Sequence, residues 1–104
     1  MAFAMPHPST TKPITSDVIE DVLSDPYQTV MLLVAKRARG GLLSSELRSR
    51  VKSIAQQADL AVEDKELRNR LRGLIKRQLL VDDGGGVVRL TEFGRRVAEA
   101  IAQQ

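Results

Sequence analysis

The chain has 104 residues, a formal net charge of +3 and no cysteine. Its length suits one domain with a modest hydrophobic core, and the absence of cysteine excludes disulfide frameworks and thiolate zinc sites and favours a reducing compartment. The charge is uneven, with a net −3 over residues 1–34 and a net +6 over residues 35–104, so we expect the second part to carry any surface for a polyanionic partner.

The first 14 residues are rich in proline, serine and threonine and show no periodicity. We expect a disordered tail over 1–14, followed by one domain over 15–104. Prolines interrupt this start before an apolar segment reaches signal length, and no stretch approaches the ~18 apolar residues of a membrane span, so we expect a cytoplasmic protein without membrane segments. The only histidine, His7, lacks partners for a metal site, and we expect neither metal nor cofactor.

Two helices are predicted at the start of the domain. A short acidic helix over about 17–24 is expected to end before Pro26. Asp25 can cap a second helix over about 26–38, because Pro26 takes the first helical position and Gln28 stands three residues after the cap. The apolar run TVMLLVA indicates that this second helix is the central helix of the core.

Two amphipathic helices follow, over about 45–58 and about 63–78. Ser44 or Ser45 is the expected cap of the first. Its apolar face consists of Leu47, Val51, Ile54, Ala55 and Ala58. The inward residues of the second are Leu67, Leu71, Leu74 and Ile75.

The stretch LLVDDGGGVVRL predicts a β-hairpin. The runs 79–81 and 87–90 are β-prone, and the aspartates and glycines between them supply the positive φ values that tight turns require. Thr91 is expected to cap a last helix. The inward side of that helix consists of Phe93, Val97, Ala100 and Ile101.

This order of elements resembles the winged helix-turn-helix superfamily of DNA-binding proteins. The stretch RLRGLIKRQLLVDDGGGVVRLTEFG is similar to the junction of recognition helix, wing and last helix in bacterial and archaeal regulators of that superfamily. The residues that carry the pattern are Leu74, Leu79, Val81, Leu90, Thr91 and Gly94. The resemblance covers residues 26–103 and assigns no subfamily. It implies a mainly α fold with a small β-hairpin, in which a short N-terminal helix precedes a three-helix core, a β wing and a C-terminal helix.

The predicted helix over 63–78 carries the candidate base-reading residues. If Leu71 faces the core, the ~100° rotation per residue of an α-helix turns a polar set outward. The set is Lys65, Arg68, Asn69, Arg72 and Lys76. In the major groove, Arg or Lys can read guanine and Asn can read adenine. The alternative is an ordinary solvated helix surface with a Glu66–Arg70 ion pair.

Candidate phosphate contacts surround this helix. They are Ser44, Ser45, Arg48, Arg70, Arg77 and Arg89. The serines could hold a phosphate at a helix N-terminus or serve only as caps, and each arginine could instead be a solvated surface charge. Asp82 and Asp83 would be repelled by phosphate, so we do not expect the wing to hold DNA with its side chains.

No recognisable catalytic constellation is present, and we expect the protein not to be an enzyme. The leading hypothesis is sequence-specific binding of double-stranded DNA by a small transcriptional regulator, acting as a homodimer because one recognition helix buries little surface. Its dimer surface could be the acidic helix 17–24 or the outer side of the last helix around Val97, Ala98 and Ile101. For each of these surfaces, packing within the core of the same chain is the alternative. The competing hypothesis is a winged-helix module that binds protein in a transcription, replication or segregation complex. The acidic N-terminal helix is the candidate surface for such a protein partner.

Overall fold

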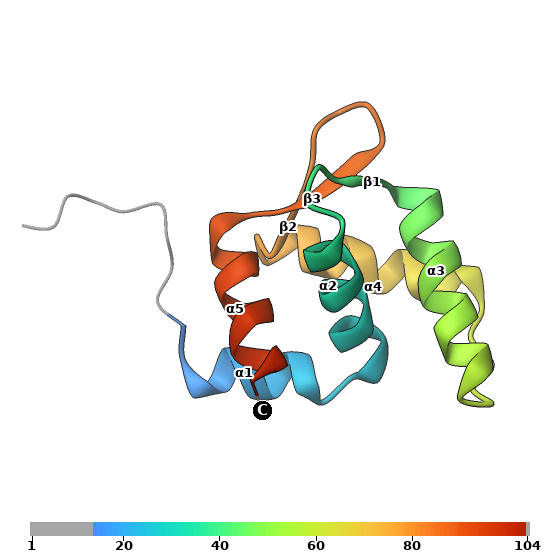
Figure 1. Ribbon diagram of the computed structural model, residues 1–104, viewed down its shortest axis with the longest axis horizontal. Helices are drawn as coiled ribbons and strands as arrows, with labels where there is room; N and C mark the ends of the chain where they lie inside the picture. Colours follow the sequence, from blue (N-terminus) through green and yellow to red (C-terminus); the bar gives the residue numbers. More distant parts are fainter. Residues whose placement is uncertain (1–13, 104) are drawn as a thin grey trace, which may run out of the picture.

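The computed structural model describes residues 14–103, which form five helices and three short strands (Figure 1). In chain order these are α1 (Ser16–Leu23), α2 (Pro26–Arg37), β1 (Leu42–Leu43), α3 (Ser44–Gln57), α4 (Asp64–Lys76), β2 (Leu80–Asp82), β3 (Val87–Leu90) and α5 (Glu92–Ala102). The expected mainly helical fold with a β-hairpin is therefore confirmed. The predicted tail lies outside the described residues, apart from Ile14 at their start.

The predicted capping residues start two of the helices. The Asp25 carboxylate accepts a hydrogen bond of 2.9 Å from the Tyr27 amide, and Pro26 is the first residue of α2. The Thr91 hydroxyl accepts a bond of 2.8 Å from the Gly94 amide at the start of α5. In both places a side-chain oxygen satisfies an amide that has no partner within the helix.

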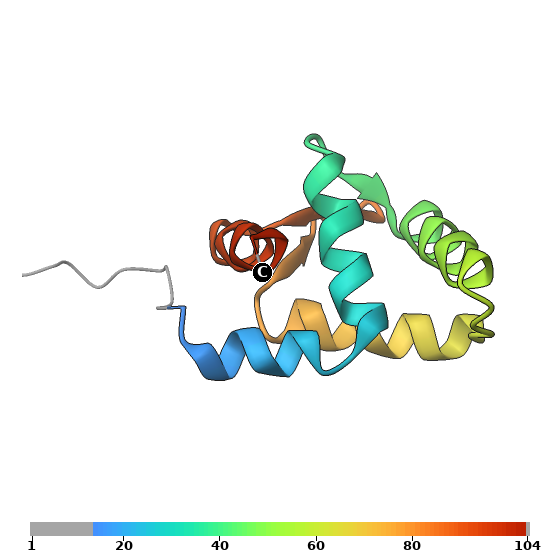
Figure 2. The ribbon, with the colours of Figure 1, turned by 60° about the horizontal axis from the view of Figure 1, so that its bottom comes forward.

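Helix α2 is the centre of the core. Met31 and Leu32 have no exposed surface. Figure 2 shows α4 running below α2, with α3 on one side and α5 on the other. Each neighbour turns apolar side chains inward, among them Leu47, Val51, Leu67, Leu74, Phe93 and Val97. Burial of this apolar surface is the main term that holds the helices together.

The sheet has one strand more than the sequence predicted. Strands β2 and β3 form the expected hairpin, and β1 pairs antiparallel with the other side of β3, so the order is β1-β3-β2. Two residues are too few to show the alternation that identifies a strand. Gly41 (φ +100°) makes the approach possible, because a Cβ at this position would lie 2.6 Å from Cγ of Arg89.

The glycine turn between β2 and β3 has the geometry expected of it. Gly84 and Gly86 have φ values of +91° and +85°, which side chains of L-residues disfavour. The two aspartates accept hydrogen bonds from the turn: Asp82 from the Gly84 amide at 2.8 Å and Asp83 from the Gly85 amide at 2.9 Å. Both acids therefore shape the turn.

The predicted start of α3 is wrong. Its N-cap is Leu43, without a side-chain hydrogen bond, so neither Ser44 nor Ser45 is the cap. Because β1 leads directly into α3, the Ser44 amide instead donates to the Gly86 carbonyl at 2.8 Å. The glycine turn is thereby joined to the first residue of α3.

Several residues are more exposed or more buried than the periodicity predicted. On α3, Ile54 is 41% exposed, and Ala58 is exposed. On α5, Ala98 is fully buried, whereas Ala100 is only partly buried. The candidate dimer surface around Val97, Ala98 and Ile101 is wrong, because all three residues belong to the core.

Candidate nucleic-acid interface

Helix α4 has one apolar and one polar face. Leu67, Leu71 and Leu74 are buried against the rest of the domain. The five predicted base-reading residues are all exposed on the other side: Lys65, Arg68, Asn69, Arg72 and Lys76. We call these five residues the α4 outer face. The orientation of the helix about its own axis thus agrees with the prediction that Leu71 faces the core.

Most of the α4 outer face has no partner among residues 14–103. Neither an ion pair nor a side-chain hydrogen bond to this part of the chain is found for Lys65, Asn69, Arg72 or Lys76. Arg68 differs, because its Nε lies 2.9 Å from an Asp64 carboxylate oxygen while its side chain stays 62% exposed. Exposed ion pairs of this i,i+4 type contribute little stability.

Gly73 belongs to the same face, although it is not among the five predicted base-reading residues. It lies four residues after Asn69 and three before Lys76, which is the spacing of one helical face. A Cβ built on Gly73 has no atom within 4 Å, so the space above the helix is open there. The helical spacing alone would have identified this position.

Arg48 connects α3 to α4. One guanidinium nitrogen lies 2.6 Å and 2.7 Å from the two carboxylate oxygens of Asp64. The Arg48 side chain is only 17% exposed. As a largely covered partner of Asp64, Arg48 is not free to bind phosphate.

Arg70 connects α4 to the start of α2. Its Nε donates to Asp25 at 2.6 Å, and its guanidinium carbon lies 5.1 Å from the centre of the Tyr27 ring. The i,i+4 pair with Glu66 exists at 3.8 Å, but the contact with Asp25 is much closer. Arg70 therefore combines an ion pair with a cation–π contact, and both hold α4 against α2.

Arg77 connects the end of α4 to α1. Its guanidinium contacts the carboxylate of Asp21 and the side-chain oxygen of Gln28, and its Nε donates to the Gly73 carbonyl at 3.3 Å. Arg48, Arg70 and Arg77 were predicted to contact phosphate. The structure instead engages all three within the chain, where they join α4 to α3, α2 and α1.

The paired acids are held in their charged form. The hydrogen bond from Arg48 is the main cause that lowers the pKa of Asp64, with burial opposing it and Arg68 adding to it. Burial tends to raise the pKa of Asp25, but hydrogen bonds from Arg70, the Tyr27 amide and Gln28 outweigh this effect, so that the pKa lies below its ordinary value. These carboxylates therefore stay ionised opposite their arginines at neutral pH.

The remaining predicted phosphate contacts are dispersed. Ser44 and Ser45 stand in the first turn of α3, next to the glycine turn. Arg89 lies on β3 and lines a separate cleft with Lys36 of α2 and Arg39 of the turn that follows α2. The structure therefore does not bring Arg89 together with the α4 outer face. Asp82 and Asp83 are exposed at the tip of the hairpin, as the sequence suggested.

Residues 14–103 contain no group of three or more His, Cys, Asp or Glu side chains that could hold a metal ion, and His7 lies outside them. Within this part of the chain, no helix has both the length and the apolar character needed to cross a membrane. Comparison of the chain with protein-family models, curated proteins and solved structures found no match.

Proposed function

We propose that this chain is a cytoplasmic winged-helix protein that binds double-stranded DNA in a sequence-specific manner and regulates transcription as a homodimer. In this proposal α4 enters the major groove, where its side chains contact the edges of the bases. The observation that carries the proposal is the α4 outer face: Lys65, Asn69 and Arg72 are exposed and lack partners among the described residues. These side chains are of the types that read guanine and adenine in the major groove.

The arrangement of the helices supports this role. Helices α2, α3 and α4 precede the β2–β3 hairpin, and α5 follows it, which is the order that the resemblance to winged helix-turn-helix proteins implies. Helix α4 is also fixed in place through its other flanks, by Arg48, Arg70 and Arg77. A rigidly held helix loses less conformational entropy on binding, which favours affinity.

The contact between the two chains of the proposed homodimer must use a surface other than the buried side of α5. The remaining candidate is α1, which joins the core through Val22 and leaves Leu23 40% exposed. One recognition helix with its surroundings buries about 600–1,000 Å² on DNA, so that a symmetric pair of chains would roughly double the contact. Analytical ultracentrifugation with and without duplex measures whether two chains bind together.

The primary test is a titration of a labelled random-sequence duplex at 50 and 200 mM salt, followed by fluorescence anisotropy. The α4 outer face holds four cationic side chains, so the affinity per chain should fall by about 150-fold between these concentrations. If Arg48, Arg70 and Arg77 also bound phosphate, the fall would be several thousandfold, on the order of 6,000. Absence of binding at both concentrations would contradict the proposal.

A matched pair of variants locates the contact. Arg72→Ala removes a cation from the α4 outer face, whereas Arg37→Ala removes one from the exposed end of α2. We expect Arg72→Ala to weaken binding to a duplex selected by the protein by about 1–3 kcal/mol and to relax one base position. Arg37→Ala should change the affinity by less than a few tenths of a kcal/mol, within about 0.3.

A second candidate function is protein binding within a transcription, replication or segregation complex. The observation that favours it is the exposed acidic surface of α1, with Asp17 and Glu20, and of the hairpin tip, with Asp82 and Asp83. The same titration decides between the two functions, because a protein-binding module of this kind needs no duplex affinity.

A further inference from the structure

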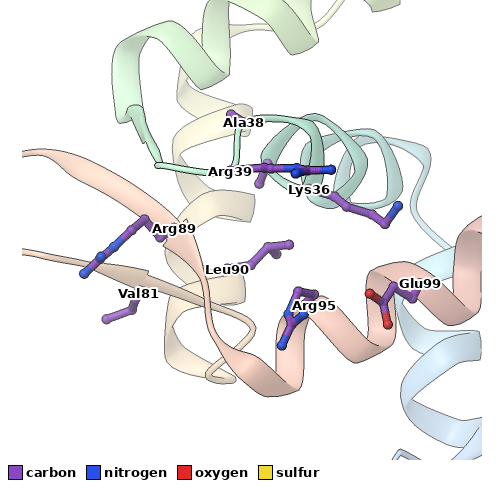
Figure 3. A pocket seen from close by; sticks show the side chains of 9 residues that line it. Lys36, Ala38, Arg39, Val81, Arg89, Leu90, Arg95 and Glu99 are labelled. Atoms are coloured by element: carbon purple, nitrogen blue, oxygen red, sulfur yellow. The ribbon is translucent and has the colours of Figure 1, made fainter.

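A basic cleft lies between the end of α2, the sheet and α5. It has a volume of about 650 Å³, which is within the range of small-molecule sites. Lys36 and Arg39 form one wall, Arg95 and Glu99 of α5 form the facing wall, and Leu90 lies between them (Figure 3). Arg89 lies at the outer end of the cleft, on β3. Four cationic residues thus line a single hollow against one acid.

The charges of this cleft are only partly compensated within the described residues. Arg95 is held by both carboxylate oxygens of Glu92, the farther one at 2.7 Å. Lys36, Arg39 and Arg89 have no ion pair or side-chain hydrogen bond with any residue of 14–103. Cations that share a hollow with too few acids to balance them repel one another, and an anion bound between them would relieve that repulsion. These three residues thus differ from Arg48, Arg70 and Arg77, each of which meets an acid.

The cleft is separate from the α4 outer face. Its lining comes from α2, the hairpin and α5, and it includes no residue of α4. In Figure 2, α4 runs along the bottom, while the end of α2 and strand β1 lie at the top. Duplex DNA lying against the α4 outer face would therefore leave the cleft open to solvent.

We propose that this cleft binds a small, multiply charged anion, a phosphorylated or polycarboxylate compound. Lys36 and Arg39 would contact its charged groups from one side and Arg95 from the other, since guanidinium groups match the geometry of both phosphate and carboxylate. Leu90 and Val81 provide an apolar surface for the uncharged part of the ligand. The proposal is independent of DNA binding, because none of these residues belongs to α4.

The test uses inorganic pyrophosphate and citrate as probes, titrated separately into the isotopically labelled chain at 150 mM salt and followed by NMR. At this ionic strength, unspecific attraction between exposed charges is largely screened. We expect saturable shifts at the amides of Lys36, Arg39 and Leu90 with at least one probe. Tighter binding of pyrophosphate assigns a phosphorylated ligand, and tighter binding of citrate assigns a polycarboxylate. Shifts that spread over the molecule without saturation, with both probes, would overturn the proposal.

Two double variants with equal loss of charge provide the control. Lys36→Gln with Arg39→Gln should weaken the better probe at least fivefold, whereas Arg72→Gln with Lys76→Gln on α4 should leave its affinity unchanged within twofold. All four side chains are exposed, and circular dichroism verifies that both variants fold. Equal weakening of probe binding in both variants would mean that the loss of affinity comes from the lower net charge alone, and it would overturn the proposal. It would also be overturned if the cleft variant lost duplex affinity as strongly as the α4 variant, because the cleft would then belong to the DNA surface.

Discussion

Replacement of Gly94 by alanine should destabilise the domain through a backbone contact between α5 and Leu79, the residue that precedes β2. A Cβ at this position would lie 1.8 Å from the carbonyl oxygen of Leu79 and 2.7 Å from its carbonyl carbon. The neighbouring atoms are backbone and cannot move aside as the end of a side chain can. The Gly94 amide is also the donor to Thr91, so that moving α5 away would strain the helix cap.

The expected loss of stability is the difference between two opposing free-energy terms. Forcing extra volume into a packed site costs about 3 kcal/mol when the backbone must shift, and the better helix propensity of alanine returns about 1 kcal/mol. The free energy of unfolding should therefore fall by about 2 kcal/mol, which corresponds to a decrease of roughly 8–16 °C in Tm for a domain of this size.

Gly73 provides the matched control, because it is also a helical glycine but a Cβ there meets nothing within 4 Å. Gly73→Ala should raise the free energy of unfolding by about 0.5–1 kcal/mol, or Tm by roughly 2–8 °C. Thermal unfolding followed by circular dichroism at 222 nm measures both variants. If Gly94→Ala were as stable as the unchanged protein, the close packing of α5 on Leu79 would be refuted.

Two further predictions concern the different roles of Arg70 and Arg72 and the dependence of stability on pH. Arg70→Ala should lower the free energy of unfolding by about 1–2 kcal/mol because it breaks the contact with Asp25, whereas Arg72→Ala should change it by less than about 0.5 kcal/mol. Urea unfolding of both variants measures the difference. A larger loss of stability in Arg72→Ala than in Arg70→Ala would contradict the structural role of Arg70. Because the pKa values of Asp25 and Asp64 are lowered in the folded state, their contribution to stability should be complete above the ordinary aspartate pKa of about 3.9 and should be lost as the pH falls through the lowered values. Asp25→Asn keeps a capping side chain but loses the charge, so its urea midpoint should fall at pH 7 and decline less between pH 5 and pH 2; an unchanged acid-side decline would remove Asp25 from the groups responsible.

The helices and the hairpin could be predicted because each has a local signal. Asp25 and Thr91 mark helix starts through their own side chains, and the leucines of α4 repeat at helical spacing. The glycine turn could be predicted from its composition, because glycine readily adopts the positive φ values found at Gly84 and Gly86. These features depend on neighbours within a few residues, which is the range that a sequence pattern reports.

The features that were missed depend on contacts between distant residues. Strand β1 exists because β3 lies beside it, and α3 starts without a serine cap because the distant Gly86 carbonyl takes the Ser44 amide. The partners of the arginines were missed for the same reason. Arg70 and Asp25 are 45 residues apart in the chain, and Arg77 and Asp21 are 56 apart. The outward side of α4 was predictable from spacing, but which of its flanking arginines are already paired was not.

The most direct test of the proposed α4 interface places one negative charge at either of two glycines. Gly73→Glu puts a carboxylate in the middle of the α4 outer face, where a Cβ meets nothing within 4 Å. Gly85→Glu makes the same change of charge at the hairpin tip, where a Cβ makes only an ordinary contact of 3.6 Å with Asp83.

The affinity of both variants is measured by anisotropy on a duplex selected by the unchanged protein, together with their Tm. With α4 in the groove, Gly73→Glu should weaken binding by at least about tenfold through repulsion from phosphate, while Gly85→Glu should change it by less than about threefold. Equal effects of the two substitutions in folded proteins would contradict the claim that α4 is the helix that meets DNA.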